Sequence, residues 1–358
     1  MKKILKFCFN TTTWQPTKSE WVHLLSSIAK DERDRVSRYV FKRDSKQTLM
    51  GQVLIRYCLK NLLNIESNNL CIGRNAKERP FLKLKESLAL AKQTNTSDYL
   101  VDFNVSHNGD YTIICAGMVN CNLKKLDDIE NSFRIGTDVM KIDIRNRTNA
   151  SQNETDEELF EKELTKHERV INSEFSDVEK NFIYSKTNPV EKLSAFYRLW
   201  CLKESYVKAL GEGIGFDIKR VETVPNSELF IDLLRKKHLV VDDTLLMVDS
   251  KLVRNCKFYE QYFTSSTNTN IQTGRVQLHV MTVCIIEKEK LNKSSNSSSS
   301  NSAASDNTRT ELDEFVEVSL TDIMPCLIPL EKLDENNCRE LEESWLKFSE
   351  KAESPFAV

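Results

Sequence analysis

The stretch that decides the fold is FYRLWCLKESYVKALGEGIGF, residues 196–216. Apolar residues recur at helical spacing through most of it and three glycines follow, so the stretch predicts a long helix that ends in a turn. Glu204 and Lys208 are four residues apart and therefore share one face of this helix. From these residues alone two interpretations are open: a surface ion pair worth about 0.3–0.5 kcal/mol, or a functional carboxylate beside a functional ammonium group.

A second informative stretch lies upstream at residues 135–140, IGTDVM, within a predicted strand at 133–142. Taken alone, Asp138 could simply end a strand or turn. Taken with Glu204 it would supply two hard oxygen ligands, which Mg²⁺ accepts when water and substrate phosphate complete its octahedron. Lys208 would add positive charge for that phosphate.

The third stretch is NVSHNGDY, residues 104–111, which predicts the end of a β-hairpin with Asn108-Gly109-Asp110 as its turn. A lone histidine such as His107 is most often a hydrogen-bonded structural residue. Basic residues occur in two further runs, at 43–46 and at 74–79, and such runs are most often solvated surface. None of these signals is specific by itself.

In their order and approximate spacing, the three stretches resemble the Sfp-type 4′-phosphopantetheinyl transferases, in particular the animal branch associated with aminoadipate-semialdehyde dehydrogenase. The resemblance covers about residues 14–286, and the pattern W-x-x-K-E-S-x-x-K at 200–208 is its most specific part. Bacterial members often carry D-x-E where this chain has Asp138-Val139-Met140. Because a methionine does not bind Mg²⁺, the resemblance implies a site of two carboxylates completed by water.

The resemblance implies an α+β fold, in which a pseudo-twofold pair of similar α/β subdomains encloses the active site in the cleft between them. It also implies that Asp138 and Glu204 hold Mg²⁺ against the pyrophosphate of coenzyme A. A carrier-protein serine would attack the β-phosphate and release adenosine 3′,5′-bisphosphate. Glu204, directly or through a metal-bound water, would take the serine proton, and Lys208 would offset charge on the bridging oxygen.

Further residues match positions that bind coenzyme A in this family. They are Arg43, Arg74, Lys77, Arg79, Ser106, His107, Lys203 and Lys208. Arg43 and His107 are the residues that we expect at the 3′-phosphate. Two roles stay open for Lys203: a contact to the pyrophosphate, or a support for the residues that make one.

The order of helices and strands predicts three parts: an N-terminal α/β subdomain at 1–134, a C-terminal α/β subdomain at 135–290, and a tail at 291–358. A polar segment at 145–158 reads as a loop, and the tail opens with a Ser/Asn-rich low-complexity segment at 291–312. Both subdomains run from helices to strands, which suggests an internal duplication. We expect the tail to lie on the body or on a partner and to be dispensable for chemistry.

Composition limits the remaining choices. The chain has 358 residues, a net charge of −2 and 40% hydrophobic residues, which gives no overall attraction to nucleic acid or membrane. The cysteines form no C-x-x-C pair, and no signal peptide or membrane span is apparent, so we expect a reduced, cytosolic location. We also expect a monomer. Expected partners are coenzyme A and apo-acyl carrier protein domains of the fatty acid synthase and aminoadipate-semialdehyde dehydrogenase type. These acidic bundles would dock on the basic segment at 33–46, although that segment could equally be a solvated helix face. The competing class is a non-catalytic module that binds coenzyme A or a carrier protein.

Overall fold

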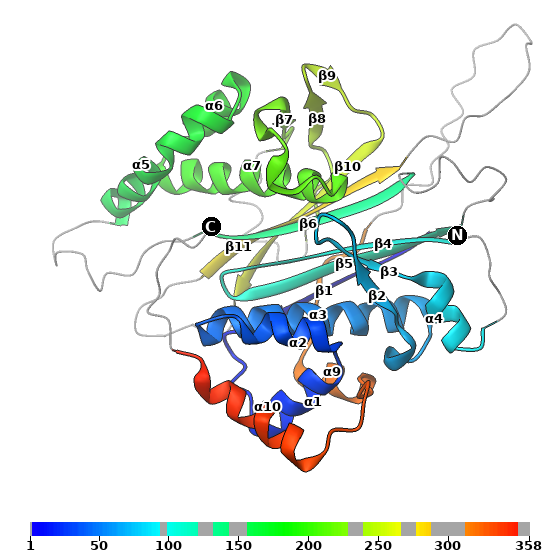
Figure 1. The fold of residues 1–358 in the computed structure, drawn as a ribbon. Coiled ribbons are helices and arrows are strands. Elements are labelled where there is room, and N and C mark those ends of the chain that lie inside the picture. The colour runs from blue at the N-terminus through cyan, green and yellow to red at the C-terminus, as the bar shows by residue number, and fades with distance from the viewer. Residues whose placement is uncertain are drawn as a thin grey trace, which may run out of the picture.

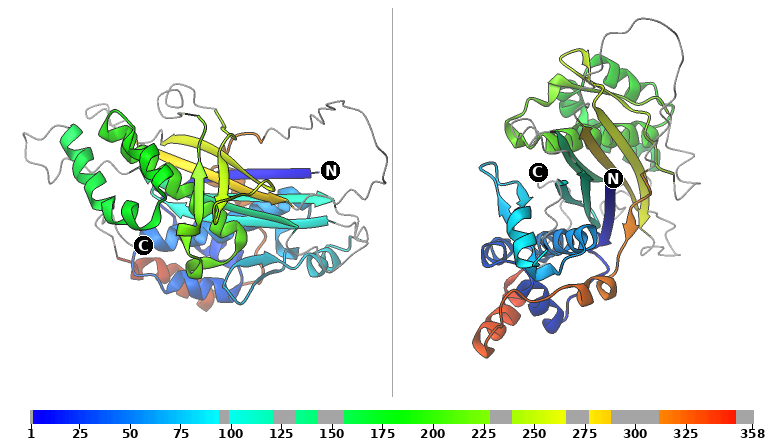
Figure 2. Two further views of the ribbon diagram at one scale, coloured as in Figure 1. Left: turned by 90° about the horizontal axis from the view of Figure 1, so that it is seen from above. Right: turned by 90° about the vertical axis from the view of Figure 1, so that its right-hand side faces the viewer.

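The computed structural model describes residues 2–93, 99–120, 132–142, 156–227, 239–265, 277–287 and 312–349. In it, two α/β units meet through their sheets, and each carries its long helix on the outer side (Figure 1). A view from the side shows the same order of layers, helices outside and strands between them (Figure 2). The α+β class expected from the sequence is confirmed. Most of the predicted loop at 145–158 and of the low-complexity segment at 291–312 lies outside the described residues.

The N-terminal unit is built on one four-stranded sheet with strand order β12-β1-β5-β4. Its main elements are β1 (Lys2–Asn10), α1 (Lys18–Ser26), α2 (Lys30–Ser37), α3 (Lys42–Leu63), β4 (Tyr99–Asn108) and β5 (Tyr111–Asn120). A small hairpin of β2 (Ile72–Arg74) and β3 (Pro80–Leu82), followed by α4 (Leu84–Leu90), connects α3 to β4. Helix α3 packs along the sheet and buries its apolar face there.

The C-terminal unit has a three-stranded sheet with strand order β10-β11-β6. Its main elements are β6 (Phe133–Ile142), α5 (Asp156–Glu174), α6 (Asp177–Tyr184), α7 (Pro189–Leu210), β10 (Cys256–Ser265) and β11 (Gln277–Glu287). A smaller sheet of β7 (Val221–Val224), β8 (Leu245–Val248) and β9 (Lys251–Leu252) lies beyond α7. Because β6 begins at Phe133, the boundary expected at 134/135 falls inside a strand.

Both units share one chain topology. In each, a 22-residue helix, α3 or α7, separates the first strand of the sheet from the second. Apart from the short tail strand of the first sheet, each sheet has three strands, and the last of these along the chain, β5 or β11, pairs with both others and lies between them. This shared order of helix and strands agrees with the internal duplication that the sequence suggested.

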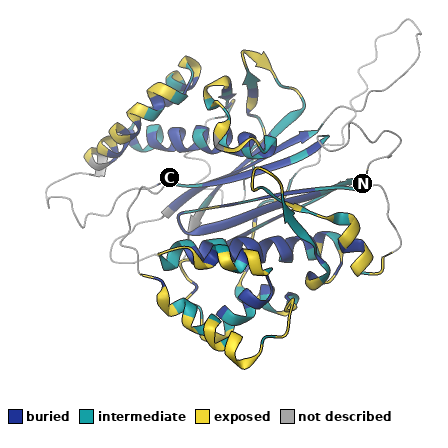
Figure 3. Ribbon diagram, in the orientation of Figure 1, coloured by how far each residue is buried: buried dark blue, intermediate teal, exposed yellow. Residues whose placement is uncertain are grey.

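Helix α7, which carries the motif of residues 200–208, has strong signals at both ends. The side chain of Asn188 accepts a hydrogen bond from the backbone of Glu191 and Pro189 follows it, which is a typical N-terminus. Gly211 ends the helix in the left-handed conformation with φ of 71°. Most of the helix is buried against β6 and β11 (Figure 3), so it is a core element.

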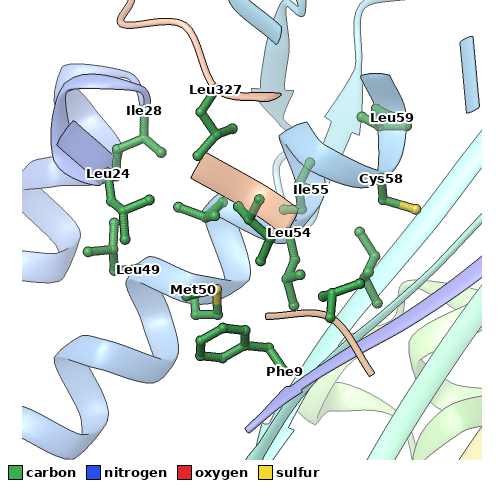
Figure 4. Close-up of a cluster of buried hydrophobic side chains, with 14 of the residues drawn as sticks. Phe9, Leu24, Ile28, Leu49, Met50, Leu54, Ile55, Cys58, Leu59 and Leu327 are labelled. Carbon is green, nitrogen blue, oxygen red and sulfur yellow. The ribbon is translucent and has the colours of Figure 1, made fainter. Parts of the chain in front are cut away.

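The tail is part of the N-terminal unit. Strand β12 (Val316–Glu317) pairs in parallel with β1, and α10 (Glu335–Lys347) packs on α1. Buried apolar residues between and after these elements join the cluster around α3. Figure 4 shows one of them, Leu327, beside Leu54 and Ile55 of α3. The tail thus lies on the body, one of the two places expected for it, and because removing it would expose the apolar surface of α3 we expect truncation to destabilise this unit; whether the tail is dispensable for chemistry stays a prediction.

Candidate active site

A close approach between α7 and β6 creates the site. Gly136 of β6 lies directly under the helix, where a Cβ atom would be 1.9 Å from the backbone oxygen of Ser205 and 2.4 Å from the nitrogen of Ala209. Only glycine fits at this position. The helix can therefore present Glu204 and Lys208 toward Asp138, which lies two residues after Gly136 on the same strand.

Three elements converge at Asp138. The Lys208 ammonium of α7 lies 2.5 Å from Asp138 Oδ1 and 2.8 Å from the hydroxyl oxygen of Ser106 on β4. The Ser106 hydroxyl donates to the same Oδ1 at 2.8 Å. Lys208 is therefore not simply the partner of Glu204 in a surface ion pair, because its ammonium group also hydrogen-bonds to side chains of β4 and β6.

The second oxygen of Asp138 has no hydrogen-bond partner among the described residues. Asp138 is 4% exposed, and its Oδ2 is buried without a hydrogen-bond partner, which is costly for a carboxylate. Burial and the nearby charge of Asp138 raise the pKa of Glu204, although Lys208 opposes the shift. An unpaired carboxylate oxygen next to a second carboxylate fits a divalent cation. Within the described ranges no three His, Cys, Asp or Glu side chains gather to hold a metal, so water and substrate would supply its other ligands.

Lys208 is held in its charged form. Burial opposes the charge, but the carboxylates of Asp138 and Glu204 outweigh it and raise the pKa of Lys208. About a third of its side chain, 30%, remains exposed, so a phosphate could still reach the ammonium group. The site therefore combines a fixed cation with a carboxylate oxygen that lacks a partner.

The turn between β4 and β5 borders this site. Gly109 has φ of 60°, and its carbonyl accepts hydrogen bonds from Arg43 at 3.0 Å and from Gln47 at 2.9 Å, both on α3. Burial of the ring, then the positive charges of Lys208 and Arg43, lower the pKa of His107. The residue nevertheless keeps solvent-exposed surface, through which its imidazole is open to a ligand.

Two further candidates lie around the β2–β3 hairpin and have acidic partners. Arg74 binds both carboxylate oxygens of Glu32, at 2.6 and 2.8 Å. Lys77 lies 2.6 Å from Glu212, and each of these two side chains is 50% exposed. Exposed ion pairs of this kind contribute little to stability, so Lys77 can exchange its partner for a phosphate at small cost.

The remaining two candidates are buried. Lys203 is fully buried, 2.9 Å from Glu179 of α6, and it donates to the backbone oxygens of Glu174 and Val221. This geometry favours the supporting role among the two that the sequence left open. The side chain of Arg79 is 8% exposed and is surrounded by protein acceptors.

A row of side chains on β4 was not recognised in the sequence. Strands β4 and β6 lie side by side, and side chains of β4 accept hydrogen bonds from the backbone of β6. The bonds run from Ile135 N to Asp102 at 2.8 Å, from Thr137 N to Asn104 at 2.9 Å, and from Lys141 N to Asn108 at 2.9 Å. With Ser106 these residues form the β4–β6 seam. Their spacing of two along an otherwise apolar strand was the available signal.

Acidic side chains nearby neutralise part of the positive charge of the basic segment at 33–46. Arg33 binds Glu331 of the tail, and Arg35 binds Glu78 and lies 4.0 Å from Glu32. These contacts offset part of the positive charge that an acidic carrier protein would meet.

Comparison with known proteins identifies the motifs. Residues 12–119 match the family model described as 4′-phosphopantetheinyl transferase, N-terminal, and residues 134–242 match that of the 4′-phosphopantetheinyl transferase superfamily. The chain is 26% identical over 326 residues to the human L-aminoadipate-semialdehyde dehydrogenase-phosphopantetheinyl transferase, covering 91% of this chain and 87% of that protein. It is 31% identical over 219 residues to the Xenopus laevis protein of the same name, 61% of each chain. It is 26% identical over 191 residues to a 4′-phosphopantetheinyl transferase of Aneurinibacillus migulanus, 53% of this chain and 59% of that protein.

Proposed function

Since the chain belongs to the 4′-phosphopantetheinyl transferase superfamily, we propose that Asp138, Glu204 and Lys208 form the centre at which it works. The protein transfers the phosphopantetheine arm of coenzyme A to a serine of an apo-carrier protein, giving holo-carrier protein and adenosine 3′,5′-bisphosphate. The observation that carries the site assignment is the buried, unpartnered Oδ2 of Asp138 beside Glu204. A module that only binds coenzyme A or a carrier needs neither carboxylate.

Asp138 and Glu204 would hold Mg²⁺, which when bound neutralises charge on the pyrophosphate of coenzyme A. Glu204 is the carboxylate suited to take the proton of the carrier serine, and burial and Asp138 raise its pKa, which makes it a stronger base. Lys208 faces the same space as a fixed cation and would stabilise negative charge on the leaving oxygen. Ser106 fixes one oxygen of Asp138, which leaves the other free to bind the cation.

The nucleotide end of coenzyme A would lie toward the turn at Gly109. Arg43 and His107 border this turn and are the proposed contacts to the 3′-phosphate. Arg74 and Lys77 stand on the β2–β3 hairpin and are proposed as further phosphate contacts, with their acidic partners released on binding.

The shared topology of the two units supports a pseudo-twofold pair of subdomains with the site between them. Residues of β4, β6 and α7 from a single chain complete the catalytic group, which is consistent with a monomeric enzyme. Acyl carrier domains of fatty acid synthase and of aminoadipate-semialdehyde dehydrogenase type are the proposed substrates. No helix in the described part of the chain is long and apolar enough to cross a membrane. The cytosolic location stays a prediction.

The assay is the mass of an apo-carrier protein after incubation with enzyme, coenzyme A and Mg²⁺. Asp138→Ala and Glu204→Gln should each reduce turnover at least ~100-fold, a loss typical of one key electrostatic group. Chelation of divalent cations should abolish transfer, and adding Mg²⁺ should restore it. Glu86→Gln, which changes an exposed carboxylate on α4 that pairs with Lys83, is the matched control and should keep normal turnover. Near-normal turnover of the Asp138→Ala enzyme would contradict the assignment.

A further inference from the structure

Arg79 makes contacts that a ligand-binding residue does not need. It lies between the two strands of the β2–β3 hairpin and reaches into the junction between the two units. Its Nη1 donates to the backbone oxygens of Lys208 at 2.6 Å and Ala209 at 3.1 Å, and its Nη2 donates to Asp102 Oδ2 at 2.8 Å, Ile135 O at 2.9 Å and Phe103 O at 3.3 Å. The five acceptors belong to α7, β4 and β6.

The guanidinium matches the chemistry of these acceptors. The last carbonyls of a helix lack the usual partner one turn further on, and the negative end of the helix dipole favours a cation there. The carbonyl of Lys208 accepts a cap hydrogen bond from Gly211 N at 3.2 Å in addition to that from Arg79. The fork of N–H donors in arginine can bind several acceptors in one plane, which an ammonium group cannot reproduce. Asp102 completes the arrangement, because the oxygen that binds Arg79 also accepts the N–H of Ile135.

The bonds of Arg79 end at residues directly connected to the site. Lys208 is both the residue whose carbonyl it binds and the residue whose ammonium contacts Asp138. Ile135 lies three residues before Asp138 on the same strand. One side chain thus ties the end of α7 to β6, on either side of the site.

We propose that Arg79 is a positioning residue: it clasps the C-terminal end of α7 to β4 and β6 and so holds Lys208 opposite Asp138. This rests on the proposed function of those two residues. The Arg79 side chain is 8% exposed, and both Nη atoms donate to protein acceptors while Nε is buried with no partner in the described part of the chain; Lys77 in the same segment is half exposed with one exposed partner. The three basic residues of segment 74–79 therefore have two roles: Arg74 and Lys77 contact the nucleotide, and Arg79 holds α7 against β4 and β6.

Steady-state kinetics with varied coenzyme A separate the two roles. Arg79→Ala should lower kcat by about 100-fold, the effect of a misplacement near 1 Å, while KM for coenzyme A stays within about twofold. Lys77→Ala, the matched control from the same segment, should raise KM with little change in kcat. Guanidinium ion at low millimolar concentration should restore part of the kcat of the Arg79→Ala enzyme and none of the loss in the Lys77→Ala enzyme. Arg79→Lys should restore little, because it cannot span the same acceptors.

A second measurement is independent of catalysis. Hydrogen exchange of backbone amides at the C-terminal end of α7, 205–211, should be faster in Arg79→Ala than in the unmodified protein and unchanged in Lys77→Ala.

If unmodified enzyme fails to transfer while this exchange pattern holds, the proposed function fails and the clasp stands. If Arg79→Ala instead raises KM at constant kcat, or leaves exchange in α7 unchanged, Arg79 is a nucleotide contact and the clasp is refuted. Should Arg79→Ala not fold, Asp102→Asn, which keeps the shape and removes the charge partner, must show the same loss of kcat at constant KM, and a normal kcat would refute the clasp.

Discussion

Replacing Gly136 by alanine tests the close approach on which the site depends. The new Cβ would lie 1.9 Å from the carbonyl oxygen of Ser205, whereas such contacts stay above 3.0 Å, so helix and strand must separate by about 1.1 Å, the difference between the two. Both opposing atoms belong to the helix backbone and cannot rotate away. The contact between Lys208 and Asp138 is 2.5 Å long and spans the same interface, so it would open by a comparable amount.

This shift should affect stability and turnover differently. Overpacking a core contact typically costs about 1–3 kcal/mol of unfolding free energy. A misplacement of about 1 Å in an active site can cost about 100-fold in rate. We therefore expect Gly136→Ala to remain folded but to lose roughly two orders of magnitude in kcat, measured by carrier-protein mass and by urea denaturation.

Gly51→Ala is the matched control, because Gly51 of α3 lies at the corresponding contact between a long helix and a sheet in the N-terminal unit. A Cβ there would meet only the methyl groups of Val105 at 3.8 and 3.9 Å and of Thr112 at 4.0 Å, which are ordinary contacts. Alanine in a helix interior is favoured over glycine by up to about 1 kcal/mol, so this variant should be slightly more stable and fully active. If Gly136→Ala matched it in stability and kcat, α7 would not rest on β6 as described, and the reasoning would fail.

Two further predictions concern the tail and acid stability. Leu327→Ala should reduce the unfolding free energy by about 2–5 kcal/mol, because Leu327 is buried against α3. The control Leu330→Ala should change it by less than about 0.5 kcal/mol, because Leu330 is more than a third exposed. Equal effects of the two variants in denaturant titrations would show that the tail is not part of the core. Burial, then Lys141 and Arg43, lower the pKa of buried His279 from 6.5 to about 3, so the unfolded chain takes up a proton below pH 6.5 and the folded chain does not. The stability that neutral His279 confers is therefore present above pH 6.5 and lost as the pH falls toward 3. Between pH 7 and pH 5 the unfolding free energy of the His279→Gln variant should fall by about 2 kcal/mol less than that of the unmodified protein. An equal fall in the two proteins would refute this.

The elements with strong local signals were predictable. The long helix that ends in a turn within residues 196–216, the strand at 133–142 and the hairpin turn at Asn108-Gly109-Asp110 all form as the sequence indicates. Their periodicity, capping residues and glycines act within a few residues, and the fold does not override them. The convergence of Asp138 and Lys208 followed from the family resemblance, because nothing local in either stretch reports the contact between them.

The roles of individual cations could not be read from the chain in the same way. Lys203 and Lys208 share one helix, but Lys203 is buried because Glu179 of another helix meets it, while Lys208 reaches a partly open site. Arg79 differs from Lys77 through Asp102, which is more than twenty residues away. Burial of a charge depends on such distant partners, and a single sequence does not show them. The tail posed the same difficulty, since its few apolar residues follow a low-complexity segment and have no regular spacing.

The β4–β6 seam explains why the site lies where the two units join. Each unit leaves an edge strand whose backbone groups need partners, and Asp102, Asn104 and Asn108 supply side-chain acceptors in place of a second backbone. Ser106 occupies the same row but turns its hydroxyl to Asp138. At Ser106, therefore, the row of β4 side chains orients the Asp138 carboxylate instead of joining the two units. Asn104 and Asn108, on either side of Ser106 in the row, keep the two strands in register there. An enzyme assembled in this way cannot let its two units move apart at the seam without also moving Asp138 away from Ser106 and Lys208.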